Sequence, residues 1–247
     1  MPESTDGVAH IMQVGFGFWP SKVLLTAVEL EVFTTLGASS MTGEELGRAL
    51  GLHPRGIWDF LDALTALGFL EREGSGVDGR YRNTSSTAQF LDKSSPAYIG
   101  GILEMCNQRL FRFWADLGEA LKTGKPQNEV KYSGRSMFET LYADEARLEQ
   151  FALAMRGISA RNFEALAERF DFSRYRTLCD VGGATALLST TLAKRHPHLQ
   201  CLSFDLPQVE PIAKRWIAKE GLSERVQTLS GDFFTQPLPR ADVITMA

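Results

Sequence analysis

The stretch Thr177–Asp205, TLCDVGGATALLSTTLAKRHPHLQCLSFD, decides the fold of the carboxyl-terminal part of this chain. It contains a short apolar run, a glycine turn, a helical pattern and a second apolar run that ends in an acid. This order predicts a βαβ unit, in which a right-handed crossover joins two parallel strands. Such units bind nucleotide-like ligands at the carboxyl ends of their strands.

The glycine turn and the acid together predict an adenosine-type cofactor. Gly182 and Gly183 can adopt backbone angles that a Cβ forbids, and they let a ligand approach the main chain. Asp205 follows Gly182 by 23 residues, where such units often carry an acid that binds both ribose hydroxyls. A dinucleotide fingerprint would also need glycine at positions 184 and 187, where this chain has Ala184 and Leu187. A pyrophosphate is therefore a poor fit.

A second candidate ligand contact is the stretch GDFF at residues 231–234. Asp232 ends a predicted strand, and its carboxylate can accept a hydrogen bond from the amine of adenine while the Phe233 ring covers the base. The alternative is a turn in which Asp232 binds local backbone amides. The glycine turn and Asp205 upstream favour the cofactor contact.

From Asp171 onward, apolar runs alternate with helical patterns, which predicts a doubly wound α/β domain. The residues between 96 and 170 are predicted to be mostly helical. The elements expected after Asp171 are strands over Thr177–Val181, Leu199–Phe204, Val226–Ser230 and Asp242–Met246, and helices over Leu187–Arg195 and Val209–Lys219.

The first 95 residues show helices followed by a hairpin, which predicts a winged-helix arrangement. A winged helix can bind DNA through its second helix, but here that helix carries Asp59 and Asp62, which would repel phosphate. A packing and dimerisation role is therefore favoured. The expected elements are a helix over Phe18–Leu36, a helix from a Thr42–Glu45 capping box to Leu50, a helix from Pro54 that Gly68 closes, and strands Leu70–Arg72 and Arg80–Asn83.

Composition narrows the class of protein. The 247 residues, 44% of them hydrophobic, suffice for a substantial core in one or two domains. The net charge of −4 gives no electrostatic footprint for nucleic acid. Because Pro20 interrupts the apolar stretch Ile11–Trp19, we expect neither a signal peptide nor a membrane span. The cysteines lack a metal-type spacing and predict free thiols in a reducing cytoplasm: Cys106, Cys179 and Cys201.

Five motifs, in order, resemble those of the small-molecule O-methyltransferases, which include plant caffeate-type, acetylserotonin-type and bacterial natural-product enzymes. The motifs are DVGGATA 180–186, FDLPQV 204–209, GLSERV 221–226, GDFF 231–234 and LPRADV 238–243. The resemblance implies S-adenosylmethionine as the cofactor and an α/β Rossmann-like methyltransferase domain preceded by an all-α, winged-helix dimerisation domain. It also implies methyl transfer to a hydroxyl of an aromatic or polyketide-like small molecule.

The resemblance, together with the residue patterns above, assigns candidate site residues. The expected cofactor contacts are Gly182, Asp205, Leu206, Asp232, Phe233 and Ser159. The expected substrate contacts fall in the helices that wall the acceptor pocket in the family: Asn107, Trp114, Phe151 and Met155.

A phenol acceptor benefits from a base that takes its proton, most often a histidine. None of the four histidines fits this role. His10 and His53 lie near the amino terminus, and His196 and His198 lie at the edge opposite the carboxyl ends of the strands, without a third ligand for a metal site. The family places its catalytic histidine just beyond the fourth strand. We therefore expect the base beyond Ala247, which would make this chain a fragment that is inactive alone.

The glycine loop departs from the family pattern Gly-Gly-Gly-x-Gly at Ala184 and Ala186. A Cβ there either needs negative φ or crowds the ligand, and a positive φ would cost on the order of 1 kcal/mol or more. Weakened cofactor affinity is the expected consequence.

Taken together, the sequence predicts a dimerisation domain over residues 1–95, pocket helices over 96–170, and half of a methyltransferase domain over 171–247. The expected partners are a hydroxylated aromatic or polyketide substrate and a second copy of the chain, without nucleic acid or membrane, in the cytoplasm. Two alternatives stay open: a winged-helix DNA-binding regulator with an adenosyl-ligand domain, and a catalytically inactive family member that acts as a partner subunit.

Overall fold

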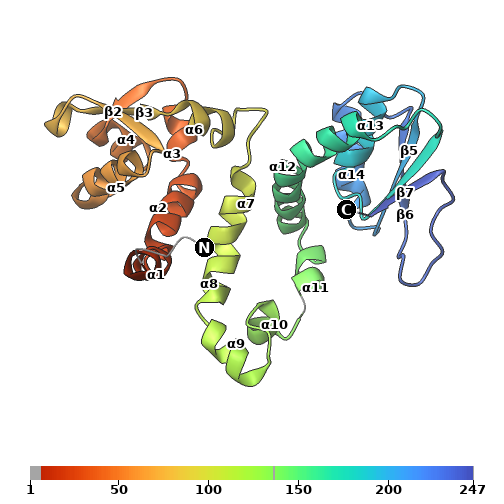
Figure 1. Ribbon diagram of the computed structural model, residues 1–247, viewed down its shortest axis with the longest axis horizontal. Coiled ribbons are helices and arrows are strands. Elements are labelled where there is room, and N and C mark those ends of the chain that lie inside the picture. Colours follow the sequence, from red (N-terminus) through yellow and green to blue (C-terminus); the bar gives the residue numbers. More distant parts are fainter. Residues whose placement is uncertain (1–6, 136, 247) are drawn as a thin grey trace. The chain divides into compact units, whose positions relative to one another are not determined.

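The computed structural model describes residues 7–135 and 137–246, and it divides into two compact units, Met1–Lys122 and Thr123–Ala247 (Figure 1). Residues 96–122 belong to the first unit in this division. The predicted boundary near residue 95 therefore separates parts of one compact unit. The three-part domain division stays a prediction.

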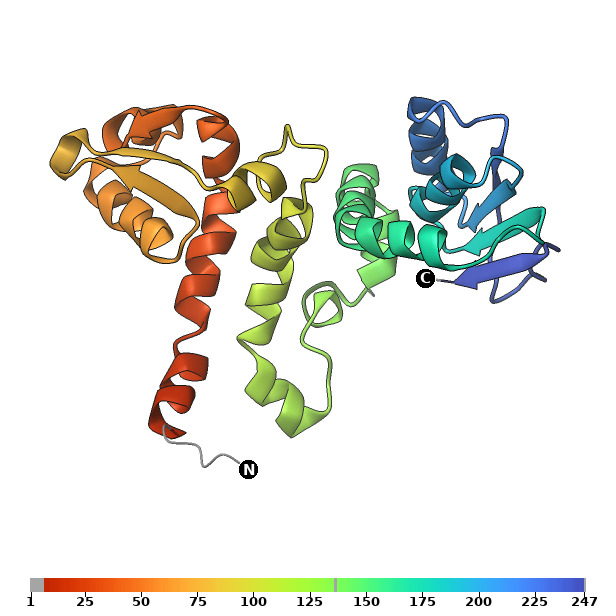
Figure 2. The ribbon, with the colours of Figure 1, turned by 45° about the horizontal axis from the view of Figure 1, so that its top comes forward.

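The first unit is mainly helical and contains one small sheet (Figure 2). Its elements are α1 (Gly7–Gly15), α2 (Phe18–Glu29), α3 (Val32–Leu36), β1 (Ser40–Thr42), α4 (Gly43–Ala49), α5 (Pro54–Ala66), β2 (Leu70–Glu73), η1 (Gly76–Asp78), β3 (Arg80–Asn83), α6 (Ser85–Phe90), α7 (Gly100–Met105), η2 (Cys106–Leu110), α8 (Phe111–Trp114) and α9 (Leu117–Thr123).

The predicted helix over Phe18–Leu36 is wrong as one element, because it breaks after Glu29. Glu31 has a left-handed backbone with φ 59°, and its carboxylate accepts a hydrogen bond from Lys93 Nζ at 2.6 Å. The break redirects the chain so that Val32, Phe33 and Leu36 are buried in the core of the unit.

The winged-helix order is present. The hairpin of β2 and β3 is extended by β1, a strand that the sequence analysis did not predict, and the three strands pair antiparallel in the order β1-β3-β2. The capping box is confirmed: Thr42 Oγ1 accepts from Glu45 N at 3.2 Å, and Glu45 Oε2 accepts from Thr42 N at 2.9 Å. Gly51 and Gly68 end their helices with positive φ, as predicted.

The core of the first unit is closed around α5 and β3. Ile57, Leu61 and Leu64 line the buried face of α5, in agreement with the predicted amphipathic pattern. Tyr81 of β3 is fully buried, and its hydroxyl donates to Asp62 Oδ1 at 2.7 Å. Arg72 binds both oxygens of the same carboxylate at 2.7 and 2.9 Å. Asp62 of α5 is thereby engaged within its own unit.

The amino-terminal helices expose apolar side chains. Val8, Ile11, Val14 and Trp19 are each more than half exposed. By length and composition alone, the segment Gly7–Glu29 passes the test for a membrane-spanning helix, with 17% of its apolar window buried. Core helices and amino-terminal targeting sequences pass the same test, so this is weak evidence against the expected absence of a span.

The second unit begins with helices and ends in a parallel sheet (Figure 1). Its described elements are α10 (Glu129–Ser133), α11 (Met137–Tyr142), α12 (Glu145–Arg169), β4 (Thr177–Val181), α13 (Leu187–Arg195), β5 (Gln200–Asp205), α14 (Glu210–Lys219), β6 (Val226–Ser230) and β7 (Val243–Met246). The four strands are all parallel, in the order β6-β5-β4-β7. The predicted parallel α/β sheet is confirmed, and its strand order reverses between β4 and β7. In the described residues, helices cover one face of this sheet.

The two faces of the parallel sheet have different coverings. Leu178, Cys201 and Val226 point to one face and join the core that α12, α13 and α14 complete. Cys179 and Phe204 point to the other face, where partly buried side chains from the segment after β6 pack against them. Cys179 and Cys201 are buried free thiols, in agreement with the sequence prediction.

Candidate cofactor site at the carboxyl edge of the parallel sheet

The turn after β4 is built on two glycines with separate roles. Gly182 has φ 73° and donates its N–H to Phe204 O at 2.8 Å, so a left-handed residue is required there. Gly183 meets a steric limit instead: a Cβ at this position would lie 2.3 Å from Ser203 Oγ. Among the described residues, nothing lies within 4 Å of where a Cβ of Gly182 would be, so the described chain leaves the outer side of the turn open.

The next residues of the loop are strained. Ala184 has φ 48° and Ala186 has φ 56°, in the region that alanine rarely adopts. Both alanines therefore have the strained positive φ and not the negative φ that would have relieved it. Each costs about 1–2 kcal/mol relative to a relaxed backbone. The loop ends at Ala186, which is fully buried and precedes α13 without a side-chain cap.

Asp205 closes the site at the end of β5. Its Oδ2 accepts from Ala184 N at 2.9 Å and its Oδ1 from Leu206 N at 2.7 Å, so the carboxylate is fixed against the loop. Burial raises the pKa of this carboxyl, while the two backbone N–H donors lower it. Each oxygen retains a lone pair for a further donor. A half-buried, oriented carboxylate of this kind suits a pair of neighbouring hydroxyls, as in a ribose.

Leu206 and Phe151 pack in the same apolar cluster, with Ile212 of α14 at its centre. The structure therefore brings one predicted cofactor contact and one predicted substrate contact together. Tyr142 of α11 packs in this cluster too, and the sequence analysis missed it. Burial and the Asp205 charge raise the pKa of the Tyr142 hydroxyl, so the ring stands near the carboxylate. In the sequence, Tyr142 is an aromatic residue four positions after Phe138. This spacing is common to any amphipathic helix, so it does not indicate a binding site.

Asp232 follows β6 and lies beside Asp205, because the N–H of its neighbour Gly231 donates to Asp205 O at 2.9 Å. Its Oδ1 accepts from Phe234 N at 2.9 Å, which is the local turn contact that the alternative interpretation required. The Phe233 ring packs on the sheet face of Cys179 and Phe204. The turn contact occupies one oxygen only, so the predicted adenine contact of Asp232 remains compatible and untested.

Asp180 is a second residue that the sequence analysis did not single out. It is 3% exposed, one residue before the end of β4, and its Oδ1 accepts from Thr245 Oγ1 at 3.0 Å. Burial, together with the charge of Asp205, raises the pKa of its carboxyl to about 7, against the lowering effect of the Thr245 hydrogen bond. Asp180 belongs to the DVGG motif. Its burial depends on the neighbouring strands of the sheet, so the motif alone does not predict it.

The remaining predicted contacts lie on helices. Met155 and Ser159 are half-buried on α12, which packs against α13. Asn107 and Trp114 lie in the first unit. Asn107 is 9% exposed within the π-helical turn η2, accepts from Lys22 Nζ and donates to Glu29 Oε2 at 2.5 Å, whereas Trp114 is 68% exposed. The roles of these four residues stay predictions.

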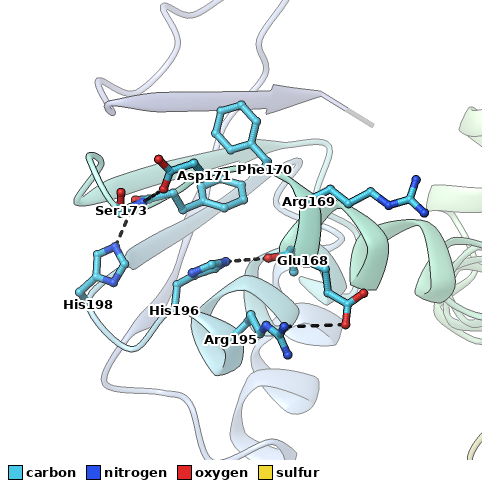
Figure 3. A pocket seen from close by; sticks show the side chains of 10 residues that line it. Glu168, Arg169, Phe170, Asp171, Ser173, Arg195, His196 and His198 are labelled. Carbon is cyan, nitrogen blue, oxygen red and sulfur yellow. Dashed lines mark hydrogen bonds and ion pairs between the residues drawn. The ribbon is translucent and has the colours of Figure 1, made fainter.

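Both histidines of the second unit lie at the amino edge of the sheet, as expected. His196 Nε2 is 2.9 Å from Ala167 O, and His198 Nε2 is 3.2 Å from Phe172 O. They line an open depression of about 450 Å³ together with Arg195, whose guanidinium is 3.8 Å from the Glu168 carboxylate (Figure 3). Within residues 7–135 and 137–246, no three His, Cys, Asp or Glu side chains form a metal-type cluster.

The carboxyl edge as a whole fits an adenosine derivative that carries positive charge. The glycine turn leaves its outer side open, Asp205 offers oriented acceptor oxygens, and Asp180 lies beneath the turn. In the described chain, no lysine or arginine forms a hydrogen bond or ion pair with Asp180 or Asp205. A cationic ligand is therefore complementary to this edge, whereas a phosphate is not.

The chain is similar to known proteins in both of its units. A model of the O-methyltransferase domain matches residues 114–247, and a model of the O-methyltransferase dimerisation domain matches residues 12–93. The tetracenomycin polyketide synthesis 8-O-methyl transferase TcmO of Streptomyces glaucescens is 40% identical over 96% of this chain and 68% of its own length. The N,N-dimethyltransferase OxyT of Streptomyces rimosus is 36% identical over 95% of this chain and 67% of its own length.

A solved structure gives the same result. Human N-acetylserotonin methyltransferase in complex with S-adenosylmethionine superposes with a TM-score of 0.88 at 27% identity, over 100% of this chain and 72% of that one.

Proposed function

We propose, from the premise that this chain belongs to the O-methyltransferase family, that its methyl acceptor is a hydroxyl of an aromatic, polyketide-like small molecule. The cofactor is S-adenosylmethionine, and the activity is that of an O-methyltransferase. The observation that carries the cofactor-site part of the proposal is the carboxylate of Asp205, held by Ala184 N and Leu206 N beside an open glycine turn.

Each residue of the carboxyl edge has a proposed task. Asp205 binds the ribose hydroxyls, Gly182 lets the main chain approach the cofactor, and Asp232 with Phe233 binds the adenine. Leu206 provides an apolar wall. When bound, S-adenosylmethionine would supply a methyl group whose carbon bonds to the acceptor oxygen as its bond to the sulfonium sulfur breaks, so that a neutral thioether leaves in line. The residues that bind the cofactor therefore orient the methyl group for transfer. They are not required to place a charge on the acceptor.

The acceptor is proposed from the relatives and from the pocket helices. TcmO is named for O-methylation in polyketide synthesis, which supports an aromatic hydroxyl. Phe151 and Met155 offer an apolar wall on α12, on the same helix as Ser159, whose proposed contact is the cofactor. An aromatic ring packs well on Phe and Met side chains.

The proton of the acceptor needs a base that the described residues do not offer at this edge. His196 and His198 bind backbone carbonyls at the opposite edge, and His53 Nδ1 caps α5 by accepting from Arg55 N at 3.2 Å. We therefore assign no catalytic residue within this sequence.

The test uses the protein expressed from its complete reading frame, with S-adenosylmethionine and a panel of naphthols and anthracene phenols. Mass spectrometry should show products heavier by one methylene, with S-adenosylhomocysteine formed in equal amount. A matched panel of aromatic amines serves as the second arm. Turnover of amines without turnover of phenols would overturn the proposed acceptor and would place the protein with N-methylating relatives such as OxyT.

We further infer that the first unit pairs with a second copy of the chain. Ile11 and Val14 are each 67% exposed on α1, and a dimerisation-domain model matches residues 12–93. An exposed apolar face of this kind is a typical interface. Light scattering should give a dimer, and Ile11→Glu should shift it toward monomer. The buried free thiols of Cys179 and Cys201 support the proposed cytoplasmic location.

A further inference from the structure

A row of polar side chains crosses the parallel sheet beneath the glycine turn. Asp180 of β4 pairs in register with Ser203 of β5 and with Thr245 of β7. The preceding row on the same face, with Leu178 and Cys201, is apolar and belongs to the core. The face that the helices cover therefore changes from apolar to polar at the last pleat before the carboxyl edge.

The polar row is incompletely satisfied. Ser203 Oγ is buried without a hydrogen-bond partner among the described residues. Among the described residues, Asp180 accepts one hydrogen bond, from Thr245 Oγ1 to Oδ1, and none at Oδ2. A Cβ on Gly183 would lie 2.3 Å from Ser203 Oγ and 3.1 Å from Asp180 Oδ2, so both oxygens face the underside of the turn. Buried polar atoms without partners are uncommon and point to a missing interaction.

The charge around Asp180 is uncompensated. The titratable groups near Asp180 are acids and thiols. Asp205 raises the pKa of Asp180, and the charge of Asp180 helps to raise the pKa values of Cys179 and Cys201. The two cations of α13 are engaged elsewhere, Lys194 with Glu220 and Arg195 with Glu168.

The acids of this region thus lack a cation. Glu210 of α14, by contrast, is paired with Lys214 at 2.8 Å and accepts from Thr228 and Ser230 of β6, so it is already satisfied. A positive ligand at the glycine turn would supply the missing charge, because opposite charge within a few ångströms favours the ionised carboxyl.

We propose that Asp180 senses the charge on the sulfur of the cofactor: it is partly protonated in the free protein at neutral pH, loses its proton to solvent when a sulfonium lies at the glycine turn, and regains a proton when the product thioether replaces it. Methyl transfer removes one positive charge from the sulfur. The ionised Asp180 therefore stabilises bound S-adenosylmethionine more than bound S-adenosylhomocysteine. As a positioning residue, Asp180 favours the replacement of S-adenosylhomocysteine by S-adenosylmethionine. This role rests on the proposed cofactor site.

The proton balance gives a direct test on the chain itself. Calorimetric titrations in phosphate and in Tris at pH 7 report the protons released on binding. With the pKa of Asp180 at about 7, S-adenosylmethionine should release about half a proton from this group. S-adenosylhomocysteine carries the same amino-acid group but no sulfonium, so it should release markedly less. Equal release by both ligands would overturn the charge-sensing role.

Three variants assign the proton to its residue. Asp180→Asn keeps an acceptor for Thr245 but cannot ionise, so the difference in proton release should vanish and the preference for S-adenosylmethionine over S-adenosylhomocysteine should fall about tenfold. Thr245→Val removes the donor that favours ionisation, so the release should move to higher pH. Glu224→Gln, at an exposed acid, should leave all values unchanged. Equal weakening of both ligands by Asp180→Asn would show a structural role only.

A measurement without ligand covers the case in which Asp180→Asn does not fold. The folded pKa of Asp180 lies above that of an unfolded Asp, so the folded state holds more protons between about pH 4 and pH 7. Its contribution to the free energy of unfolding must therefore decrease as pH rises through this window. Infrared titration of the carboxyl should show a group protonated well above pH 4.

A carboxyl already ionised at pH 5 in the free protein would contradict the proposal. If neither ligand binds, the cofactor site at this edge fails and the charge-sensing role with it; that outcome differs from equal proton release, in which the site stands and the role fails.

Discussion

The turns that end α4 and α5 in the first unit place glycines, Gly51 and Gly68, in the left-handed region, whereas the turn above the parallel sheet places Ala184 and Ala186 there. The buried hydroxyl of Tyr81 has its partner in Asp62, whereas the buried hydroxyl of Ser203 has none. The exceptions in the first unit are scattered: Glu31 is left-handed at the break after α2, and Arg72 Nε and Asn83 Oδ1 are buried without a hydrogen-bond partner among the described residues. In the second unit, two strained residues and an unpartnered buried hydroxyl occur together at one loop.

This difference separates a structural module from a binding site. Local strain and unsatisfied polar groups persist only where the surrounding structure enforces them, and they gather where a ligand is bound. In this protein the strained alanines, the buried Asp180 and the unpartnered Ser203 lie around a single glycine turn. Their occurrence together at one turn supports the proposed place of the site.

The largest expected effect is on the stability of the first unit. Tyr81→Ala removes a fully buried ring and should lower the free energy of unfolding by about 3–5 kcal/mol. Urea unfolding measures this change. Tyr81→Phe, which keeps the ring and removes the hydroxyl, should cost about 1 kcal/mol. Affinity for S-adenosylmethionine should be unchanged wherever the variant remains folded, and a several-fold loss would contradict the separation of the two regions.

A smaller effect in free energy, but a decisive one for binding, is expected at Asp205. Two charge-assisted hydrogen bonds to ribose are each worth about 1.5 kcal/mol or more, so Asp205→Ala should weaken S-adenosylmethionine binding about 100-fold. Calorimetry gives the dissociation constant, and Glu224→Ala serves as the exposed control. Since Asp205 also binds Ala184 N and Leu206 N, thermal unfolding must accompany the titration. A loss below threefold in a folded variant would refute the ribose contact.

The smallest effect sharpens the comparison at the strained loop. Ala184→Gly should relieve the positive φ and stabilise the protein by about 0.5–1 kcal/mol, with tighter cofactor binding. Ala186→Gly relieves similar strain but removes a fully buried methyl group, which offsets the gain by about 0.8 kcal/mol. Thermal unfolding of the two variants tests this order. Stabilisation by Ala186→Gly alone, or weaker cofactor binding by both, would be inconsistent with strain in the loop.

The sequence predicted the elements whose signals are local. The capping box at Thr42, the hairpin at β2 and β3, and the alternation from β4 to β6 were all found, because periodicity and turn residues specify them within a few positions. The break at Glu31 was missed, since nothing in its neighbours forbids helix and the core alone requires the turn.

The site was predictable in the same measure. Asp205 could be placed because its spacing from the glycine turn is characteristic of the fold. Asp180 and Tyr142 could not, because their proximity to Asp205 depends on strand register and on a helix distant in sequence. Asp232 lay between these cases: its strand end was predicted, but the Phe234 N–H that binds its carboxylate follows from the turn geometry.

Hydrogen exchange of the backbone amides, measured with and without S-adenosylmethionine, tests the cofactor site most directly. The ligand should slow exchange in residues 182–186, 205–206 and 231–234, which follow the carboxyl ends of three strands. Residues 196–198 at the opposite edge should exchange as before. Protection at residues 196–198, or no protection in the loops after β4 and β5, would contradict the placement of the cofactor at the carboxyl edge.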